Sequence, residues 1–229
     1  DRLRNDWLLE LGRRRDWANF ARDHAAYRMQ DDREVACYDL LVRHQAGQDV
    51  KAAALAAWHA QRDLDDGCQL LARTLAEAKR LAAGDIWHEL RLSVEANRPR
   101  AARASASLIG PTTAKAVDEA LDQPARVLKR RLVDPSGQRQ ELATLALIRL
   151  AQTDLDEAVQ ALEAGWSRDL PDELAALAWA AIGRQAALRL QERAHDFYQL
   201  AWQRQREHGH APRWSDDTLA WSVRAALRA

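Results

Sequence analysis

The chain is poor in the residues that interrupt helices and in the residues that build strands. Its 229 residues include only 9 Gly and 6 Pro, and runs of Val, Ile, Thr and Tyr are missing. Gly and Pro destabilise helix interiors, whereas β-branched and aromatic residues favour strands. These shortages indicate a helical chain.

Several functional signatures are also missing. There is no phosphate-binding loop and no dinucleotide fingerprint, so we expect no cofactor. The 34 basic and 34 acidic residues give no net charge, whereas nucleic-acid modules usually carry a basic excess. No apolar run approaches the ~20 residues that span a bilayer. We therefore expect no nucleic-acid partner and no membrane span.

What the chain has in quantity is Ala, Leu and Trp. Hydrophobic residues make up 47%, and 9 are Trp. Ala lets helices pack closely and each Trp buries a large area. Short amphipathic segments end at Gly, Pro or Asp and form helix-turn-helix units of roughly 30 residues, which bury their faces by stacking. We predict an all-α chain: a curved, right-handed-type α-superhelix, or solenoid, of stacked antiparallel helix pairs.

We expect residues 1–229 to form a single elongated domain. Two turns could divide it: Gly110-Pro111, near 110–112, and Asp134-Pro135-Ser136-Gly137, near 134–137. In the second half, Thr153 is the expected N-cap of one helix, Pro171 opens another, and Ser215 caps the last. The chain starts at Asp1 and runs out within an amphipathic helix, which favours a processed form or a fragment of a longer protein.

Both cysteines open apolar stripes on helices of the first third. Cys37 lies on a helix expected over 31–46, Cys68 on one over 65–81, and a helix over 49–61 separates them. Stacked hairpins of this kind suit a structural disulfide, which would stabilise the fold by roughly 3–4 kcal/mol. Free buried thiols are the alternative. Thiol catalysis is disfavoured because His44 lies two helical turns from Cys37.

Carboxylates and histidines give no catalytic or metal pattern. Glu89, Glu95 and Glu163 lie on charge-rich helices, and we expect them to be solvated helix residues. His208 and His210 are closely spaced but lack the other ligands of a zinc site, so a polar loop is expected there. We predict no metal site.

The tryptophans divide into two groups by position. Five lie on apolar helical stripes and are expected in the core: Trp7, Trp17, Trp58, Trp87 and Trp179. Trp166 and Trp214 lie near helix ends, and only these two are candidates for contact with a ligand.

An ordered series of segments carries a family resemblance. It begins with D-W-L-L-E-L-G-R-R-R-D-W-A-N-F, continues through V-A-C-Y, A-G-Q, A-A-W and G-C-Q-L-L, and extends to D-L-P-D-E-L-A-A-L-A-W-A-A-I-G-R and W-S-V-R-A-A-L-R. The series, with both cysteines in place, resembles the N-terminal superhelical (U-shaped) region of the soluble lytic murein transglycosylases.

The resemblance implies a curved helical scaffold that forms a ring with a lysozyme-like catalytic domain. Such enzymes cleave the β-1,4 bond between N-acetylmuramic acid and N-acetylglucosamine in peptidoglycan and leave 1,6-anhydro products. Their catalytic Glu lies in an E-S motif followed by G-L-M-Q-I-M-P, and neither motif occurs here. The resemblance thus implies a scaffold without catalytic residues.

The expected partners are the glycan strand, for which Trp166 and Trp214 are the candidate contacts, and a catalytic domain downstream of residue 229. The expected location is the periplasm, after removal of a signal peptide. The alternative is a stand-alone interaction module similar to tetratricopeptide repeats, although W-x2-L-G-x2-Y is absent.

Overall fold

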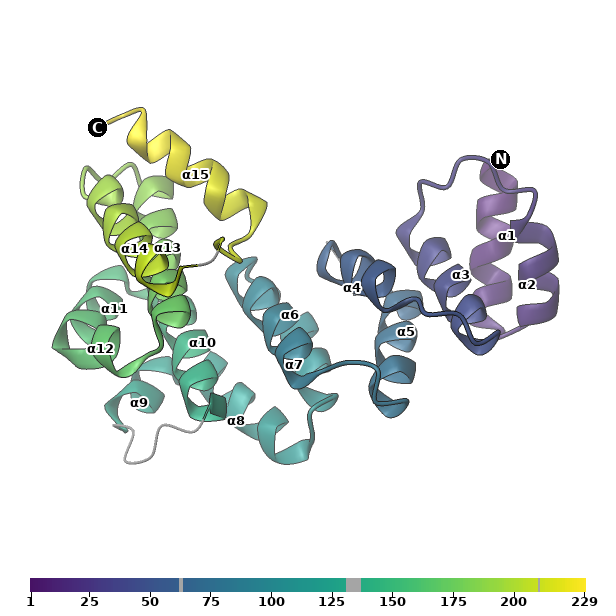
Figure 1. Ribbon diagram of the computed structural model, residues 1–229, viewed down its shortest axis with the longest axis horizontal. Helices are drawn as coiled ribbons and strands as arrows, with labels where there is room; N and C mark the ends of the chain where they lie inside the picture. Colours follow the sequence, from purple (N-terminus) through teal and green to yellow (C-terminus); the bar gives the residue numbers. More distant parts are fainter. Residues whose placement is uncertain (62–63, 131–136, 210) are drawn as a thin grey trace. The chain divides into compact units, whose positions relative to one another are not determined.

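The computed structural model describes residues 1–61, 64–130, 137–209 and 211–229, except the side chains of residues 207 and 208. Helices and their connections make up this described part, which contains no strand (Figure 1). The predicted all-α class is confirmed.

The chain divides into two compact units. Unit 1 contains residues 1–89 and 104–109, and unit 2 contains 90–103 and 110–229. One division therefore falls between Ile109 and Gly110, beside the first sub-boundary that we predicted. The second, at 134–137, lies outside the described residues except for Gly137, where a helix begins.

The helices of the first half are short. Their bounds are α1 (Arg2–Arg13), α2 (Trp17–His24), α3 (Arg33–Gln45), α4 (Lys51–His59), α5 (Asp66–Glu77), α6 (Ala83–Glu95) and α7 (Pro99–Ser107). The division into units runs through α6 and α7, so each contributes residues to both.

The second half contains the longest helices. Their bounds are α8 (Pro111–Asp122), α9 (Pro124–Lys129), α10 (Gly137–Thr153), α11 (Leu155–Ala161), a π-helical turn (Leu162–Trp166), α12 (Ser167–Asp169), α13 (Asp172–Leu188), α14 (Ala194–His208) and α15 (Asp216–Ala226). Gly165 has a φ of 149° inside the π-helical turn, which an L side chain rarely adopts. The turn redirects the chain between α11 and α12.

Side-chain caps determine where several helices begin. The carboxylate of Asp16 accepts a hydrogen bond from the backbone N–H of Asn19, and Asp32 and Asp65 do the same at α3 and α5. Ser215 caps α15 as predicted. Each cap satisfies a backbone donor that has no partner within its helix.

The predicted N-cap at Thr153 is wrong by one residue. Thr153 is the last residue of α10, and its hydroxyl donates back to the carbonyl of Leu150 at 3.2 Å. Asp154 caps α11 instead, accepting from the N–H of Glu157 at 2.9 Å. Both residue types suit an N-cap, and the outcome depends on how far α10 continues.

Tyr38 is the centre of the unit 1 core. It is fully buried and packs with Leu8, Leu11 and Phe20 from α1 and α2. A Cβ atom on Gly12 would approach the Tyr38 ring to 2.3 Å, so α1 approaches the ring this closely only because residue 12 is Gly.

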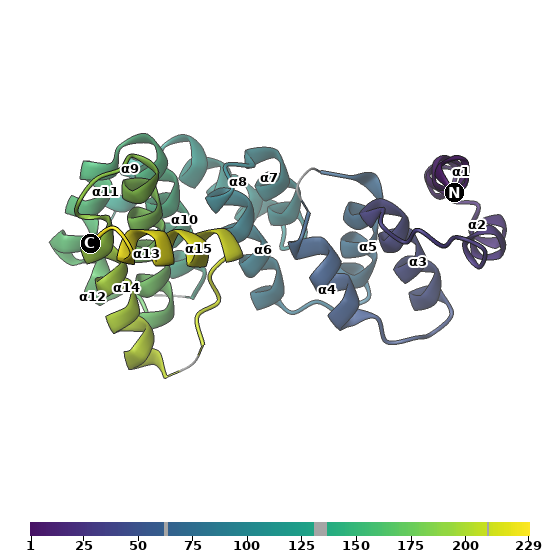
Figure 2. The same ribbon diagram turned by 90° about the horizontal axis from the view of Figure 1, so that it is seen from above.

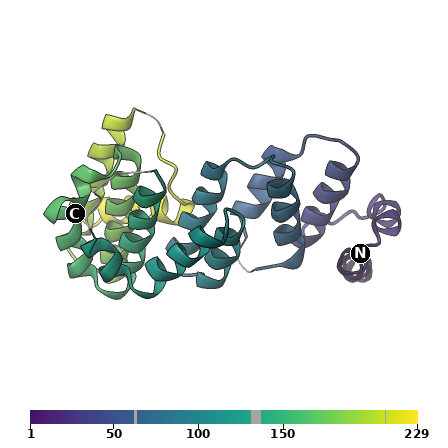
Figure 3. The same cartoon turned by 90° about the horizontal axis from the view of Figure 1, so that it is seen from below.

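Unit 2 is built around α13, which is buried along most of its length and packs against α10, α14 and α15. In Figures 2 and 3, α13 and α14 lie in the green and yellow-green part of the chain, and the two helices pack against each other. Small residues make this packing possible: a Cβ on Gly183 would approach the Tyr198 ring to 3.0 Å.

Candidate functional site

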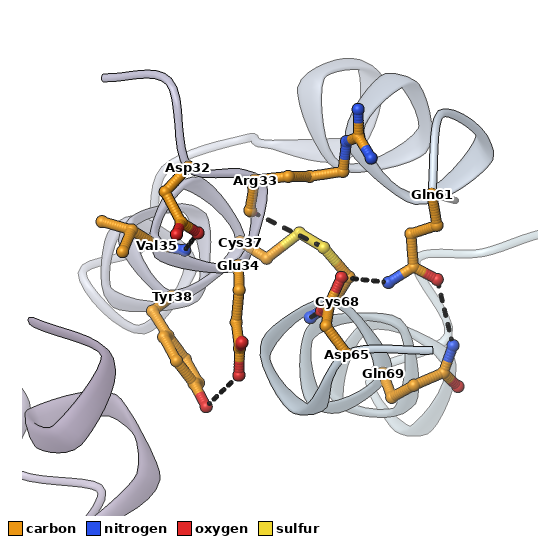
Figure 4. The surroundings of a disulfide bond; sticks show 10 residues. All are labelled: Asp32, Arg33, Glu34, Val35, Cys37, Tyr38, Gln61, Asp65, Cys68 and Gln69. Carbon is orange, nitrogen blue, oxygen red and sulfur yellow. Dashed lines mark hydrogen bonds between the residues drawn. A yellow bond between two sulfur atoms is a disulfide. The ribbon is translucent and has the colours of Figure 1, made fainter. Parts of the chain in front are cut away.

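The two cysteines meet between α3 and α5. Their Cα atoms are 4.9 Å apart and the sulfurs form a disulfide, as the sequence predicted (Figure 4). Both cysteines are fully buried, together with Leu41, Leu71 and Leu75. The bond fixes two helices that α4 separates in sequence, and the hydrophobic cluster excludes water from it.

Polar residues complete this junction. Asp65 accepts from the N–H of Cys68 at 2.7 Å and from the amide of Gln61 at 2.9 Å. The Tyr38 hydroxyl lies 3.1 Å from Glu34 and 2.9 Å from Asp66. Burial raises the pKa of the Asp65 and Glu34 carboxyls, and burial together with the nearby carboxylates raises the pKa of the Tyr38 hydroxyl. The hydrogen bond from Tyr38 to Asp66 connects α3 to α5.

The prediction that Glu89 and Glu95 are solvated is wrong. Glu89 is 1% exposed and Glu95 is 6% exposed, whereas Glu163 is exposed as expected. The Glu95 carboxylate accepts hydrogen bonds from the hydroxyls of Ser215 and Thr218 at the start of α15. These two partners are 120 and 123 residues away from Glu95, so the local charge pattern did not reveal its burial.

The sequence analysis also missed a buried ion pair. Arg91 Nη1 donates to both carboxylate oxygens of Glu141, at 2.6 Å each. Burial raises the pKa of Glu141, and Arg91 acts in the opposite direction. The pair joins α6 to α10 within unit 2. Both oxygens of the Glu141 carboxylate lie against the Arg91 guanidinium.

Four of the five tryptophans assigned to the core lie at least partly within it. Trp58, Trp87 and Trp179 are buried and Trp17 is half-buried. Trp7 departs from the prediction, with 47% of its surface exposed. The face of α1 that packs against α2 and α3 carries Leu8 and Leu11, and Trp7 lies at its side, where its indole N–H donates to Asp23 at 2.7 Å.

The structure places the two tryptophans considered for glycan contact in the interior. Trp166 and Trp214 are each 7% exposed. The indole N–H of Trp166 donates to the carbonyl of Leu128, and Trp214 packs on Trp202 with ring centroids 4.6 Å apart. Little of either ring is exposed, and Trp166 also lines two cavities of unit 2, so contact of these two residues with a glycan stays a prediction. Helix-end position was therefore a poor guide to exposure.

Other predicted features concern metals and membranes. His210 and the side chain of His208 lie outside the described residues. Within the described part of the chain, no group of three or more His, Cys, Asp or Glu side chains could hold a metal ion. Among the described helices, none is both long and apolar enough to cross a bilayer.

Comparison with known proteins gives a similarity in fold. No family model matches the chain, and no curated protein matches it. Among solved structures, an inactive mutant of the lytic transglycosylase Slt from Pseudomonas aeruginosa matches with a TM-score of 0.65 and 23% identity. The match covers 99% of this chain and 36% of that one. This chain therefore has the helical fold of part of a lytic transglycosylase.

Proposed function

We propose that this chain is a helical scaffold of a periplasmic lytic transglycosylase that acts on peptidoglycan. The observation that carries the proposal is the fold match to the Slt enzyme, which extends over 99% of this chain. The ordered sequence segments resemble those of the same family.

The catalytic region, on this proposal, lies outside these 229 residues. The match spans 36% of the Slt chain, which leaves room there for other parts. The E-S and G-L-M-Q-I-M-P motifs are absent from this sequence. The Glu95 carboxylate is held by Ser215 and Thr218, and the Glu141 carboxylate is held by Arg91.

A scaffold contributes to catalysis by positioning. A curved superhelix would orient the glycan strand toward a catalytic acid, and proximity alone lowers a barrier by several kcal/mol. The disulfide supports a periplasmic location because such bonds persist in oxidising compartments.

Isolated sacculi provide the test. The purified 229-residue chain should release no 1,6-anhydro muropeptides, and the parent protein with its catalytic region should release them. If the chain alone released these products, and substitution of one of its own Glu residues abolished the release, the scaffold proposal would be wrong. A parent protein without a lysozyme-like region would favour the interaction-module alternative.

A further inference from the structure

A cavity of unit 2 lies between α9, α11 and the π-helical turn. Its volume is about 370 Å³, within the range of about 300–1,000 Å³ that small-molecule sites occupy. Helices α9 and α11 both pack against α10, whose Leu150 lines the cavity (Figure 1). The lining residues come from positions 125–169, so neither end of the chain contributes to this space.

Small side chains keep the cavity open. Ala125 of α9, Ala161 of α11 and Ala164 of the π-helical turn all line it. Ala161 lies four residues after Glu157, and Lys129 lies four residues after Ala125, so each pair shares one helix face toward the cavity. Larger side chains at the three alanine positions would fill this space, because protein interiors pack closely.

The π-helical turn forms one end of the cavity. Gly165 adopts a φ of 149° there, and the next residue, Trp166, lines the cavity. The indole N–H of Trp166 donates to the carbonyl of Leu128 at 3.2 Å, which holds the ring against α9. Turns of this kind occur frequently at functional sites. A cavity and an irregular turn therefore coincide at the same place.

Polar side chains surround the apolar base of the cavity. They are the ammonium of Lys129, the amide of Gln160 and the carboxylates of Glu157 and Asp169. Among the residues that the structure describes, no hydrogen bond or ion pair includes any of these four side chains. Together they offer both donors and acceptors to a ligand. Two carboxylates against one ammonium disfavour an anion.

We propose that this cavity binds one sugar unit of a β-1,4-linked, N-acetylated glycan. The apolar face of the pyranose ring lies against Leu128, Leu150 and Trp166. The hydroxyl and acetamido groups bond to the polar side chains at the rim, which supply the donors and acceptors that such an uncharged ligand needs. The choice of a glycan over another uncharged polar ligand rests on the proposed function.

NMR signals of the indole N–H groups test the proposal on the 229-residue chain. The probe is the β-1,4-linked trimer of N-acetylglucosamine, and maltotriose is the control sugar. The trimer should shift the Trp166 signal with a dissociation constant on the order of 1 mM. The Trp214 signal should stay unchanged, because this buried indole does not line the cavity. Trp166→Phe and Trp214→Phe serve only to assign the two signals. No shift at Trp166, or an equal shift with maltotriose, would overturn the proposal.

Substitutions in the lining supply a second test. Ala161→Leu fills the cavity and should weaken binding of the trimer about ten-fold. Ala114→Leu is its matched control, because Ala114 is also half-buried in unit 2 and lines no part of this cavity.

Gln160→Ala, at an exposed position of the rim, should weaken binding about five-fold, equivalent to ~1 kcal/mol for one hydrogen bond. Glu163→Ala is its control, since Glu163 is exposed nearby and does not line the cavity. Circular dichroism checks that each variant is folded. Unchanged binding in the folded lining variants, or an equal loss in their controls, would contradict the assignment.

The parent protein separates this inference from the scaffold proposal. Release of 1,6-anhydro muropeptides by the parent, together with no shift at Trp166, would remove the cavity assignment and leave the scaffold proposal standing. A specific shift at Trp166, together with a parent protein that releases no such products, would have the opposite meaning.

Discussion

Glu95 connects two segments that are far apart in the sequence. It lies in the last turn of α6, and its carboxylate accepts hydrogen bonds from Ser215 and Thr218. Ser215 at the same time caps α15 by accepting from the N–H of Thr218 at 3.1 Å. Removing the carboxylate therefore affects the start of α15 as well as α6.

Replacing Glu95 with Ala should lower the free energy of unfolding by about 2 kcal/mol, because two buried hydroxyls lose a charged acceptor. Urea denaturation measures this loss. The matched control is Glu163→Ala, at an exposed position, where a change within about 0.5 kcal/mol is expected. Equal losses in the two variants would show that the hydrogen bonds contribute nothing.

Asp65 should make stability depend on pH. Burial raises its folded-state pKa above the ordinary 3.8, so the protonated form favours folding. This contribution is fully present below pH 3.8 and is lost as the pH rises through the folded-state pKa. Asp65→Asn keeps an oxygen for the Cys68 N–H but does not ionise.

The wild-type free energy of unfolding, relative to Asp65→Asn, should therefore fall as the pH rises from about 4 through the folded-state pKa of Asp65. Urea titrations of both proteins at a series of pH values measure the difference. A difference that rose over this interval would mean that the folded state lowers the pKa instead.

At the scale of helices, close contacts at glycines limit what the chain tolerates. Gly12→Ala places a methyl group 2.3 Å from the Tyr38 ring, and the unfolding free energy should fall by about 2 kcal/mol because the core is overpacked. Gly84→Ala is the control, because a Cβ at this position in α6 has open space around it. This substitution should stabilise the protein by about 0.5–1 kcal/mol. Thermal denaturation distinguishes the two, and equal shifts would contradict the packing account.

Local sequence signals predicted many helix ends well. Ser215 is an N-cap as expected, Asp16 caps α2, and Gly47 follows α3 in the left-handed region. These features depend on a few neighbouring residues. The π-helical turn at 162–166 was not predicted; its last residue, Trp166, donates its indole N–H to the carbonyl of Leu128, 38 residues away. Tertiary contacts of this kind leave no periodic trace in the sequence.

At the scale of the whole molecule, the disulfide belongs to one of two compact units. The 31-residue separation of its cysteines predicts a loss of roughly 3–4 kcal/mol on reduction. Because α3 and α5 lie in unit 1, and α13 and α14 form their own core in unit 2, the loss should be local.

Hydrogen exchange with and without reductant tests this expectation. Reduction, or Cys37→Ser with Cys68→Ser, should increase exchange in α3, α4 and α5 and leave α13 and α14 unchanged. Uniform loss of protection along the chain would mean that the two units unfold together.

The candidate sites were less predictable than the fold. The Cys37 and Cys68 pairing followed from helical stripes of the first third, which are local features. The ion pair of Arg91 and Glu141 did not follow from such features, because its two residues are 50 positions apart in the sequence. The interior positions of Trp166 and Trp214 were likewise set by distant neighbours, Leu128 and Trp202.

The position of Tyr38 has a consequence for how such sequences can diverge. A Cβ on Gly12 from α1 would meet its ring at 2.3 Å. A larger residue at position 12 is compatible with this packing only after the ring has become smaller. Among natural relatives that keep this fold, positions 12 and 38 should therefore change together, and an aromatic residue at 38 should be inherited with a small residue at 12.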